Sequence, residues 1–285
     1  MAIARDYKKI IWVGGPLAIA SGFILVYWPV LSGLWNTWMH SEDYSHGFLV
    51  VPVCLYIAFK KKERLLELLA TDTKWVPGVV LVGFSLVLHV FSFWAGVFTL
   101  SALSLILTVT GLVLVFLGPQ GGRTLCLPLS LLFFMVPFPA QIYTLLTHPL
   151  QLIVTKGAVF LASQTGIPLF REGNIIHLPE QTLQVVQACS GMRSILSLLF
   201  LAAIFGYFTL QKNSLRWILF MLGLPIAVAV NTLRIFGIIL ASYWFRIDLL
   251  TGVWHTFYGM VLFILSLGLL CLAQRLVSLW PVPSS

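Results

Sequence analysis

The chain has 285 residues, of which 59% are hydrophobic and 9% charged, and its mean hydropathy is +0.99. Soluble globular domains carry about 25% charged residues, so this composition excludes that class and indicates a membrane protein. The net charge of +8 does not indicate nucleic-acid binding, because Lys and Arg lie in short segments between apolar runs instead of on one basic face. We therefore expect contact with membrane lipid and no nucleic-acid partner.

Eight apolar stretches approach the length that a membrane-spanning helix needs, about 20 residues. They predict an all-α polytopic membrane protein, folded as a single integral-membrane domain over residues 1–285. The third and fourth stretches are almost contiguous, which predicts a tight helical hairpin. In chain order the predicted spans cover about 10–31, 46–59, 75–93, 95–117, 124–143, 191–210, 215–245 and 255–276.

The basic residues orient these spans. With eight spans, the basic loops all fall on one side, and the first loop on the other side carries Glu42 and Asp43. Because cytoplasmic loops are enriched in Lys and Arg, both termini are predicted to be cytoplasmic. The basic residues on that side are Arg5, Lys8, Lys9, Lys60, Lys61, Lys62, Arg64, Lys74, Arg123, Lys212, Arg216 and Arg275.

One outer loop, over residues 138–190, is too long to be a simple connector. Its first part, residues 141–164, is apolar and predicts an interfacial or re-entrant helix. Its second part, residues 167–189, breaks into short apolar runs around a Glu-Gly-Asn turn, which predicts a short β-hairpin on the outer surface before the sixth span.

Cys189 stands out among the four cysteines. Cys54, Cys126 and Cys271 lie within apolar spans, where a cysteine is usually a small packing residue. Cys189 instead precedes Ser190 and the start of the sixth span, where the helix dipole favours a thiolate and Arg193 adds positive charge. Both a nucleophile and a packing residue are compatible with this position.

Arg234 lies inside the seventh span, and a charge at that depth is costly and indicates a functional site. All nine carboxylates lie outside the predicted spans, so a partner for Arg234 could come only from a loop, a thiolate, backbone groups or a bound substrate. A carboxylate that orients the imidazole of His255 could likewise be only Asp248 or one from the long loop. Asn231 lies one turn earlier on the same helix face. His255 begins the eighth span, at the same outer level as Cys189 and Arg234. A thiol, an imidazole and a guanidinium at one depth are the groups that acyl transfer through cysteine requires.

Two alternatives remain at this point. His46, in Tyr44-Ser45-His46-Gly47, also lies at the outer face, and His46, His255 and Cys189 could together hold a metal, although no metal-site spacing is present. A membrane transporter or an exopolysaccharide-export subunit could use Arg234 to bind an anion while Cys189 merely packs. We find no inverted repeat of broken helices, which would favour the transporter.

Three ordered motifs resemble those of the exosortase/archaeosortase family: Ala188-Cys189-Ser190-Gly191-Met192-Arg193-Ser194, Asn231-Thr232-Leu233-Arg234-Ile235, and His255 in the last span. Tyr44-Ser45-His46-Gly47 and the Arg171-Glu172-Gly173-Asn174 turn also match. The resemblance runs from about residue 40 to the end, and His255 places the chain nearer the bacterial exosortases.

This resemblance implies a cysteine transpeptidase or protease of the bacterial inner membrane, with its active site on the periplasmic side. It would process exported proteins that carry a C-terminal sorting signal: a motif such as Pro-Glu-Pro, a transmembrane helix and a basic tail. Cys189 would be the nucleophile, Arg234 the oxyanion-stabilising or substrate-orienting cation, and His255 the general acid/base. Support or substrate binding would come from His46, Ser190, Arg193 and Asn231. No cofactor or metal is implied, and water or an unknown acceptor would resolve the acyl-enzyme.

Overall fold

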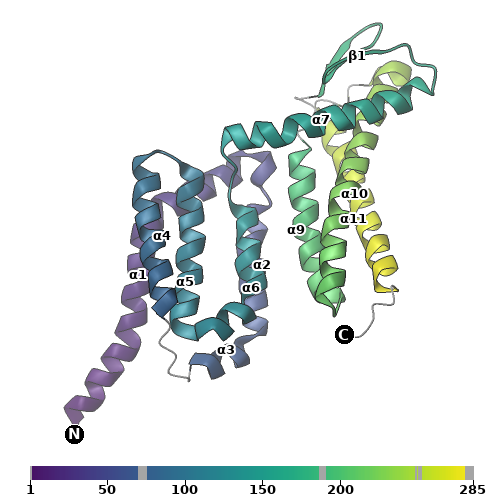
Figure 1. The fold of residues 1–285 in the computed structure, drawn as a ribbon. Helices are drawn as coiled ribbons and strands as arrows, with labels where there is room; N and C mark the ends of the chain where they lie inside the picture. Colours follow the sequence, from purple (N-terminus) through teal and green to yellow (C-terminus); the bar gives the residue numbers. More distant parts are fainter. Residues whose placement is uncertain (1, 70–75, 186–190, 248, 250–251, 280–285) are drawn as a thin grey trace. The chain divides into compact units, whose positions relative to one another are not determined.

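The structure is a computed structural model that describes residues 2–69, 76–185, 191–247, 249 and 252–279, with the backbone alone for residues 2–16 (Figure 1). The described chain forms two compact units, Met1–Pro139 and Ala140–Ser285. Among the described residues, seven helices are long and apolar enough to cross a membrane. The prediction of an all-α polytopic membrane protein is therefore confirmed.

The first unit contains one very long helix, a helical hairpin and several short helices. Their bounds are α1 (Ala2–His40), η1 (Glu42–Tyr44), α2 (Gly47–Lys60), α3 (Lys62–Leu69), α4 (Val76–Trp94), α5 (Phe98–Thr124), α6 (Cys126–Leu131) and η2 (Leu132–Met135). Three of them match predicted spans: α1 contains 10–31, α4 matches 75–93 and α5 matches 95–117.

The predicted tight hairpin is formed by α4 and α5, which pack along each other and turn at Gly96, where φ is +68°. Buried hydroxyls join the two helices: Ser92 Oγ lies 2.8 Å from Ser101 Oγ, and Ser85 Oγ lies 2.6 Å from Thr108 Oγ1. The Tyr27 hydroxyl of α1 is 2.7 Å from the same Thr108 oxygen. Such hydrogen bonds between small polar side chains help membrane helices to associate.

The fifth predicted span, 124–143, is not one helix, and this part of the prediction was wrong. The chain forms α6 and η2 over Cys126–Met135 and is then extended from Val136. Pro137 and Pro139 explain the break, because proline lacks a backbone N–H and favours an extended residue before it. The second predicted span, 46–59, is the 14-residue helix α2, about 21 Å long at 1.5 Å per residue. It packs against α6 and η2, and each of these segments is shorter than a bilayer core of about 30 Å.

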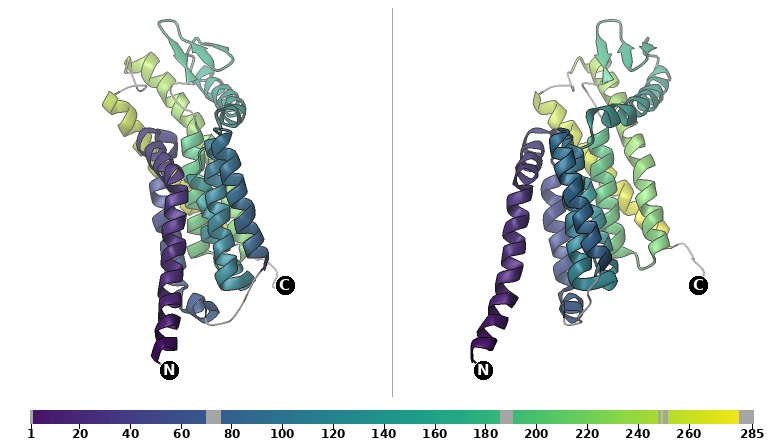
Figure 2. Two further views of the ribbon diagram at one scale, coloured as in Figure 1. Left: turned by 90° about the vertical axis from the view of Figure 1, so that its left-hand side faces the viewer. Right: turned by 60° about the vertical axis from the view of Figure 1, so that its left-hand side comes forward.

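The second unit is a group of three long helices with a fourth helix across their ends. Their bounds are α7 (Ala140–Ser163), α9 (Met192–Thr209), α10 (Asn213–Leu240), continued by the π-helical turn η3 (Ala241–Phe245), and α11 (Gly252–Ser278). The views in Figures 1 and 2 show α7 lying crosswise at one end of α9, α10 and α11. The predicted helix over 141–164 is thus present, and its direction within the unit fits an interfacial helix.

A three-stranded antiparallel sheet follows α7. Its strands are β1 (Phe170–Glu172), β2 (Ile175–His177) and β3 (Thr182–Gln184), in the order β1-β2-β3. The predicted hairpin is confirmed as β1 and β2, which turn at Gly173 with φ +62° and pair Glu172 with Ile175. The buried face of the sheet packs on α7 and α10 through Ile176, Val154 and Ile239. This core fixes the end of β3, from which the chain continues toward Cys189.

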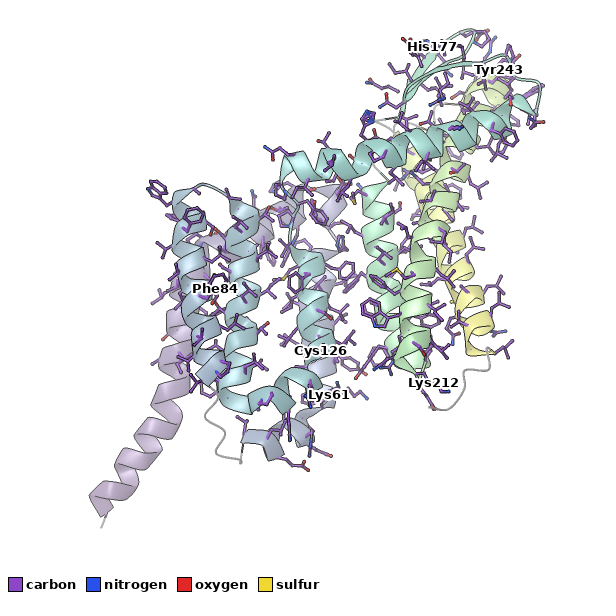
Figure 3. The ribbon with its side chains drawn as sticks, in the orientation of Figure 1. Lys61, Phe84, Cys126, His177, Lys212 and Tyr243 are labelled. Atoms are coloured by element: carbon purple, nitrogen blue, oxygen red, sulfur yellow. The ribbon has the colours of Figure 1, made fainter. Side chains whose placement is uncertain are left out.

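Basic residues that the loop pattern assigns to the cytoplasm can be located within each unit. In the first unit, Lys61 Nζ donates a hydrogen bond to the Thr124 carbonyl, which joins the basic segment after α2 to the end of α5 beside Arg123. In the second unit, Figure 3 shows Lys212 at the end opposite His177 and Tyr243, which lie at the sheet end. The sheet end of the second unit also carries Arg171 on β1 and Arg246, which bonds Glu180 beside the sheet, so the two ends of this unit differ less in charge than the loops predict. The assignment of the Lys212 end to the cytoplasm stays a prediction.

Candidate active site

A contact between Arg234 and His255 forms the centre of the candidate site. Arg234 lies on α10 and His255 in the first turn of α11, and Arg234 Nη2 is 3.2 Å from His255 Nε2. Both side chains are partly buried. Among the described residues, Arg234 makes no ion pair with a carboxylate. The sequence places these two residues at one level of the membrane, and the structure brings them into direct contact.

The hydrogen bonds of His255 define which ring nitrogen carries the proton. His255 Nδ1 lies 2.9 Å from the Leu249 carbonyl oxygen, and a carbonyl can only accept, so Nδ1 is the protonated nitrogen. In a neutral ring, Nε2 then has a free lone pair that accepts the Arg234 N–H. The orienting group is thus a backbone carbonyl of the segment before α11. Asp248, the carboxylate that we considered for an acidic partner, lies outside the described residues.

Asn231 links this pair to the start of α9. It is 5% exposed, and its Nδ2 would lie 2.8 Å from a Cβ placed on Gly191. Asn231 Oδ1 and Arg234 Nε are buried and have no hydrogen-bond partner among the described residues. Both residues line a cavity of about 40 Å³ together with Ser194 and Ser266. The site therefore contains one acceptor, Asn231 Oδ1, and one donor, Arg234 Nε, that are available to hydrogen-bond a ligand.

Cys189 and Ser190 lie outside the described residues, so their prediction is not tested here. The chain resumes at Gly191, two residues after Cys189, and Gly191 is the N-cap of α9 with φ +66°. Arg193 lies in the first turn of α9, as expected, and is partly buried. The described residues thus bring Asn231, Arg234, His255 and the N-terminus of α9 into one region of the second unit.

Gly191 itself gives a testable prediction. A side chain at φ +66° is strained by about 1–2 kcal/mol, and its Cβ would also meet Asn231 Nδ2 at 2.8 Å and Leu150 Cδ2 at 3.0 Å. We expect Gly191→Ala to lower substrate processing by about tenfold or more, measured as the initial rate in membranes. Gly166→Ala is the matched control, because Gly166 has φ +77° but nothing within 4 Å of its Cβ position. Equal rates for both variants would contradict the prediction.

His46, predicted to be a supporting residue, belongs to the first unit. It is 8% exposed and precedes α2, and its Nε2 lies 2.9 Å from the Phe134 carbonyl. Neighbouring side chains bond the end of η2 and the extended segment after it: Trp38 Nε1 donates to the Met135 carbonyl at 3.2 Å, and the Tyr44 hydroxyl accepts the Phe138 N–H at 3.0 Å. His46 therefore has a structural task within its own unit, holding this segment in place.

Burial lowers the pKa of His46 below its ordinary value of 6.5, against the opposing effects of its hydrogen bonds and of Asp43. Folded His46 then stays neutral while the unfolded chain takes up a proton. Stability is consequently retained above pH 6.5 and lost as the pH falls below it. We expect the thermal stability in detergent to fall between pH 7.5 and 5.5, and His46→Gln, which keeps a donor but does not titrate, to reduce that fall. The same fall in the variant would contradict this role.

Several residues of the site carry no motif in the sequence. The Leu249 carbonyl acts through the backbone, which side-chain patterns do not report. Gly259 on α11 packs beside Arg234, whose Nη2 lies 3.8 Å from the Gly259 Cβ position, an ordinary van der Waals distance. A glycine four residues after a membrane histidine was the signal that could have pointed to this packing.

Among the described residues, no three His, Cys, Asp or Glu side chains gather in a group that could hold a metal ion. The metal alternative included Cys189, which the described part of the chain does not contain, so this observation does not test it. The described cysteines Cys54, Cys126 and Cys271 are free thiols.

A model of the transmembrane exosortase family matches residues 35–272, which includes every residue of the site. The chain belongs to the transmembrane exosortase family. Searches of curated proteins and of solved structures gave no significant match. The matched region runs through both structural units, so the exosortase sequence pattern includes the His46 segment as well as the Arg234–His255 pair.

Proposed function

We propose that this exosortase is a membrane-embedded cysteine transpeptidase or protease. It cleaves the C-terminal sorting signal of exported proteins through an acyl-enzyme on Cys189. The observation that carries the proposal is the hydrogen-bonded Arg234–His255 pair, in the same region as Gly191, two residues from Cys189. Family membership supports the reaction class, and the Arg234–His255 contact supports a proton carrier and a cation side by side.

In the proposed reaction, His255 Nε2 takes the proton of the Cys189 thiol, and the thiolate attacks the scissile carbonyl. The new C–S bond creates an oxyanion, which Arg234 stabilises. His255 then returns its proton to the leaving amine as the C–N bond breaks. The Leu249 carbonyl keeps the proton on Nδ1, so that Nε2 is the nitrogen that exchanges protons.

The Arg234–His255 hydrogen bond has a consequence for this sequence of events. While Arg234 donates to His255 Nε2, the lone pair of that nitrogen is occupied. Arg234 therefore has to leave Nε2 before that nitrogen takes up the thiol proton, and afterwards both side chains are cations and can no longer share this bond. Arg234 is then free to contact the developing oxyanion when negative charge appears. Proton transfer and charge stabilisation would thus be coupled through one contact.

Attack by water on the thioester gives a cut protein, whereas attack by an acceptor amine gives a transferred one. We place the reaction on the outer face of the bacterial inner membrane. The positive-inside pattern of the predicted loops supports this placement, with Lys212 at the end opposite the sheet (Figure 3). The exported substrate approaches within the membrane through its own transmembrane helix.

The test is co-expression with an exported reporter that ends in a sorting motif, a transmembrane helix and a basic tail, followed by mass analysis of the new C-terminus. We expect the tail to be lost only when the exosortase is present. A mass equal to that of the cut chain indicates hydrolysis, and added mass identifies the acceptor. A reporter that keeps its tail across a panel of sorting motifs would contradict the proposal.

A further inference from the structure

Tyr258 makes a second contact between the two helices that carry Arg234 and His255. It lies on α11 one turn after His255, and its hydroxyl donates a hydrogen bond to the Leu233 carbonyl of α10 at 3.0 Å. The Arg234 carbonyl lies 3.3 Å from the same hydroxyl. A tyrosine side chain thus touches the backbone of the residue whose guanidinium contacts His255.

This contact depends on Gly237. A Cβ at residue 237 would lie 2.0 Å from Tyr258 Oη and 2.9 Å from Cζ, distances that side-chain atoms cannot adopt without movement. Gly237 is one turn after Arg234 on α10. Because glycine has no side chain, the Tyr258 hydroxyl can approach the backbone of α10 at this position. A glycine inside a helix costs about 1 kcal/mol relative to alanine, and here close packing accounts for its presence.

Two neighbouring side chains of α11 therefore hold one turn of α10. His255 contacts the side chain of Arg234, and Tyr258 contacts the backbone from which that side chain extends. A rotation or slide of α11 would break the tyrosine hydrogen bond and would change the 3.2 Å distance between Arg234 Nη2 and His255 Nε2. The backbone contact thus fixes the position of the side-chain contact.

We propose that Tyr258, which packs against Gly237, is a positioning residue that sets the distance between Arg234 and His255. The effect on catalysis rests on the proposed function. In that function His255 has to exchange a proton with Cys189, and Arg234 has to contact the oxyanion of the substrate. Tyr258 acts on the reaction through Arg234 and His255, and it has no contact with the reacting atoms in this scheme.

The first test is a double-mutant cycle on the full-length protein in membranes. Tyr258→Phe removes one hydrogen bond, and we expect kcat for reporter processing to fall about tenfold while KM stays unchanged. Gly237→Ala forces the hydroxyl away and is expected to reduce kcat further. In Gly237→Ala/Tyr258→Phe the clash with Oη is absent while the smaller overlap with Cζ at 2.9 Å remains, so kcat should recover part of the way from Gly237→Ala toward Tyr258→Phe.

The second test reads the geometry of His255 without catalysis. In ¹⁵N-histidine-labelled protein, the His255 signal is assigned by its loss in His255→Gln. We expect the wild-type signal to have the pattern of a ring protonated at Nδ1 and hydrogen-bonded at Nε2. In Tyr258→Phe the hydrogen bond from Arg234 to Nε2 should weaken, so the Nε2 resonance should shift toward that of an imidazole nitrogen that accepts no hydrogen bond. A general loss of stability would not produce this selective change, since it would affect the remaining histidines too.

Tyr243→Phe and Gly268→Ala are the matched controls. The Tyr243 hydroxyl has no hydrogen bond to another described residue, and nothing lies within 4 Å of the Gly268 Cβ position. Unchanged kcat and an unchanged His255 signal in Tyr258→Phe would overturn the proposal, as would a double variant no better than Gly237→Ala. If no variant, wild type included, processes any reporter but the His255 signal shifts, the proposed function fails and the positioning of His255 by Tyr258 stands.

Discussion

Replacement of Cys189 by alanine is expected to reduce reporter processing by at least roughly 10³-fold, because removing the nucleophile of a covalent mechanism eliminates the acyl-enzyme route. Unprocessed reporter should accumulate, while insertion and thermal stability of the enzyme stay unchanged. Cys189→Ser is expected to be almost as inactive, since a hydroxyl has a far higher pKa than a thiol and is much harder to convert into the nucleophilic anion. The measurement is the fraction of tail-free reporter as a function of time, with enzyme amount normalised by immunoblot.

The other cysteines provide the control. Cys54, Cys126 and Cys271 are free thiols, and Cys54 is buried with its sulfur 3.1 Å from the Pro128 carbonyl. Alanine at Cys126 and Cys271, which are exposed in the structure, should leave processing intact. Normal processing by Cys189→Ala would eliminate the mechanism.

Thiol labelling of intact cells distinguishes the cysteine transpeptidase or protease from a transporter. In a variant that retains Cys189 as its single cysteine, a membrane-impermeant maleimide should label the protein, and His255→Ala should slow the labelling. A transporter in which Cys189 only packs predicts no dependence on His255.

The sequence predicted most of the helices because hydrophobic length is a strong signal in a membrane protein. It failed at 124–143, where the apolar run continues but Pro137 and Pro139 end the helix. Val136 and Phe138 continue the apolar run up to the next helix, so the hydrophobic residues alone do not mark the boundary. The prolines themselves were the available signal, and their effect on the preceding residue predicts the break.

The short helices α2 and α6 show a second reason for that failure. A span was assigned wherever an apolar stretch suited the charge pattern, yet α2 has 14 residues and the α6–η2 segment covers Cys126–Met135. Their packing against each other depends on contacts between residues about 70 positions apart, such as Cys54 with Pro128. Periodicity within one segment contains no information about such a partner.

Arg234 and His255 could be predicted from sequence because their depth and chemistry are unusual in a membrane helix. The contact between them could not, since it requires the register of α10 against α11. The close contact between Tyr258 and Gly237 belongs to this register, and both are ordinary residues for a membrane helix when taken one by one. The role of the Leu249 carbonyl was equally inaccessible, because any residue type at position 249 provides the same oxygen.

Replacement of Arg234 by alanine is expected to lower kcat by roughly 10²–10³-fold, the usual effect of removing one group that stabilises an oxyanion. Arg234→Lys keeps the positive charge but replaces a planar group with several donors by a single ammonium, so we expect an intermediate loss. Processing rates at saturating reporter give kcat, and thermal unfolding in detergent gives stability. Arg275→Ala, which removes an exposed charge at the other end of α11, is the matched control and should be neutral in both measurements.

The thermal stability of Arg234→Ala distinguishes a structural role of the arginine from a catalytic one. A structural cation in a membrane helix would be neutralised by a carboxylate, and Arg234 has none among the described residues, while its Nε is buried without a hydrogen-bond partner. Such an arrangement costs free energy in the resting protein. Arg234→Ala should therefore leave the melting temperature unchanged or raise it while processing falls. A variant that loses stability in proportion to activity would show instead that the arginine holds the helices together, and the charge-stabilising role would then be wrong.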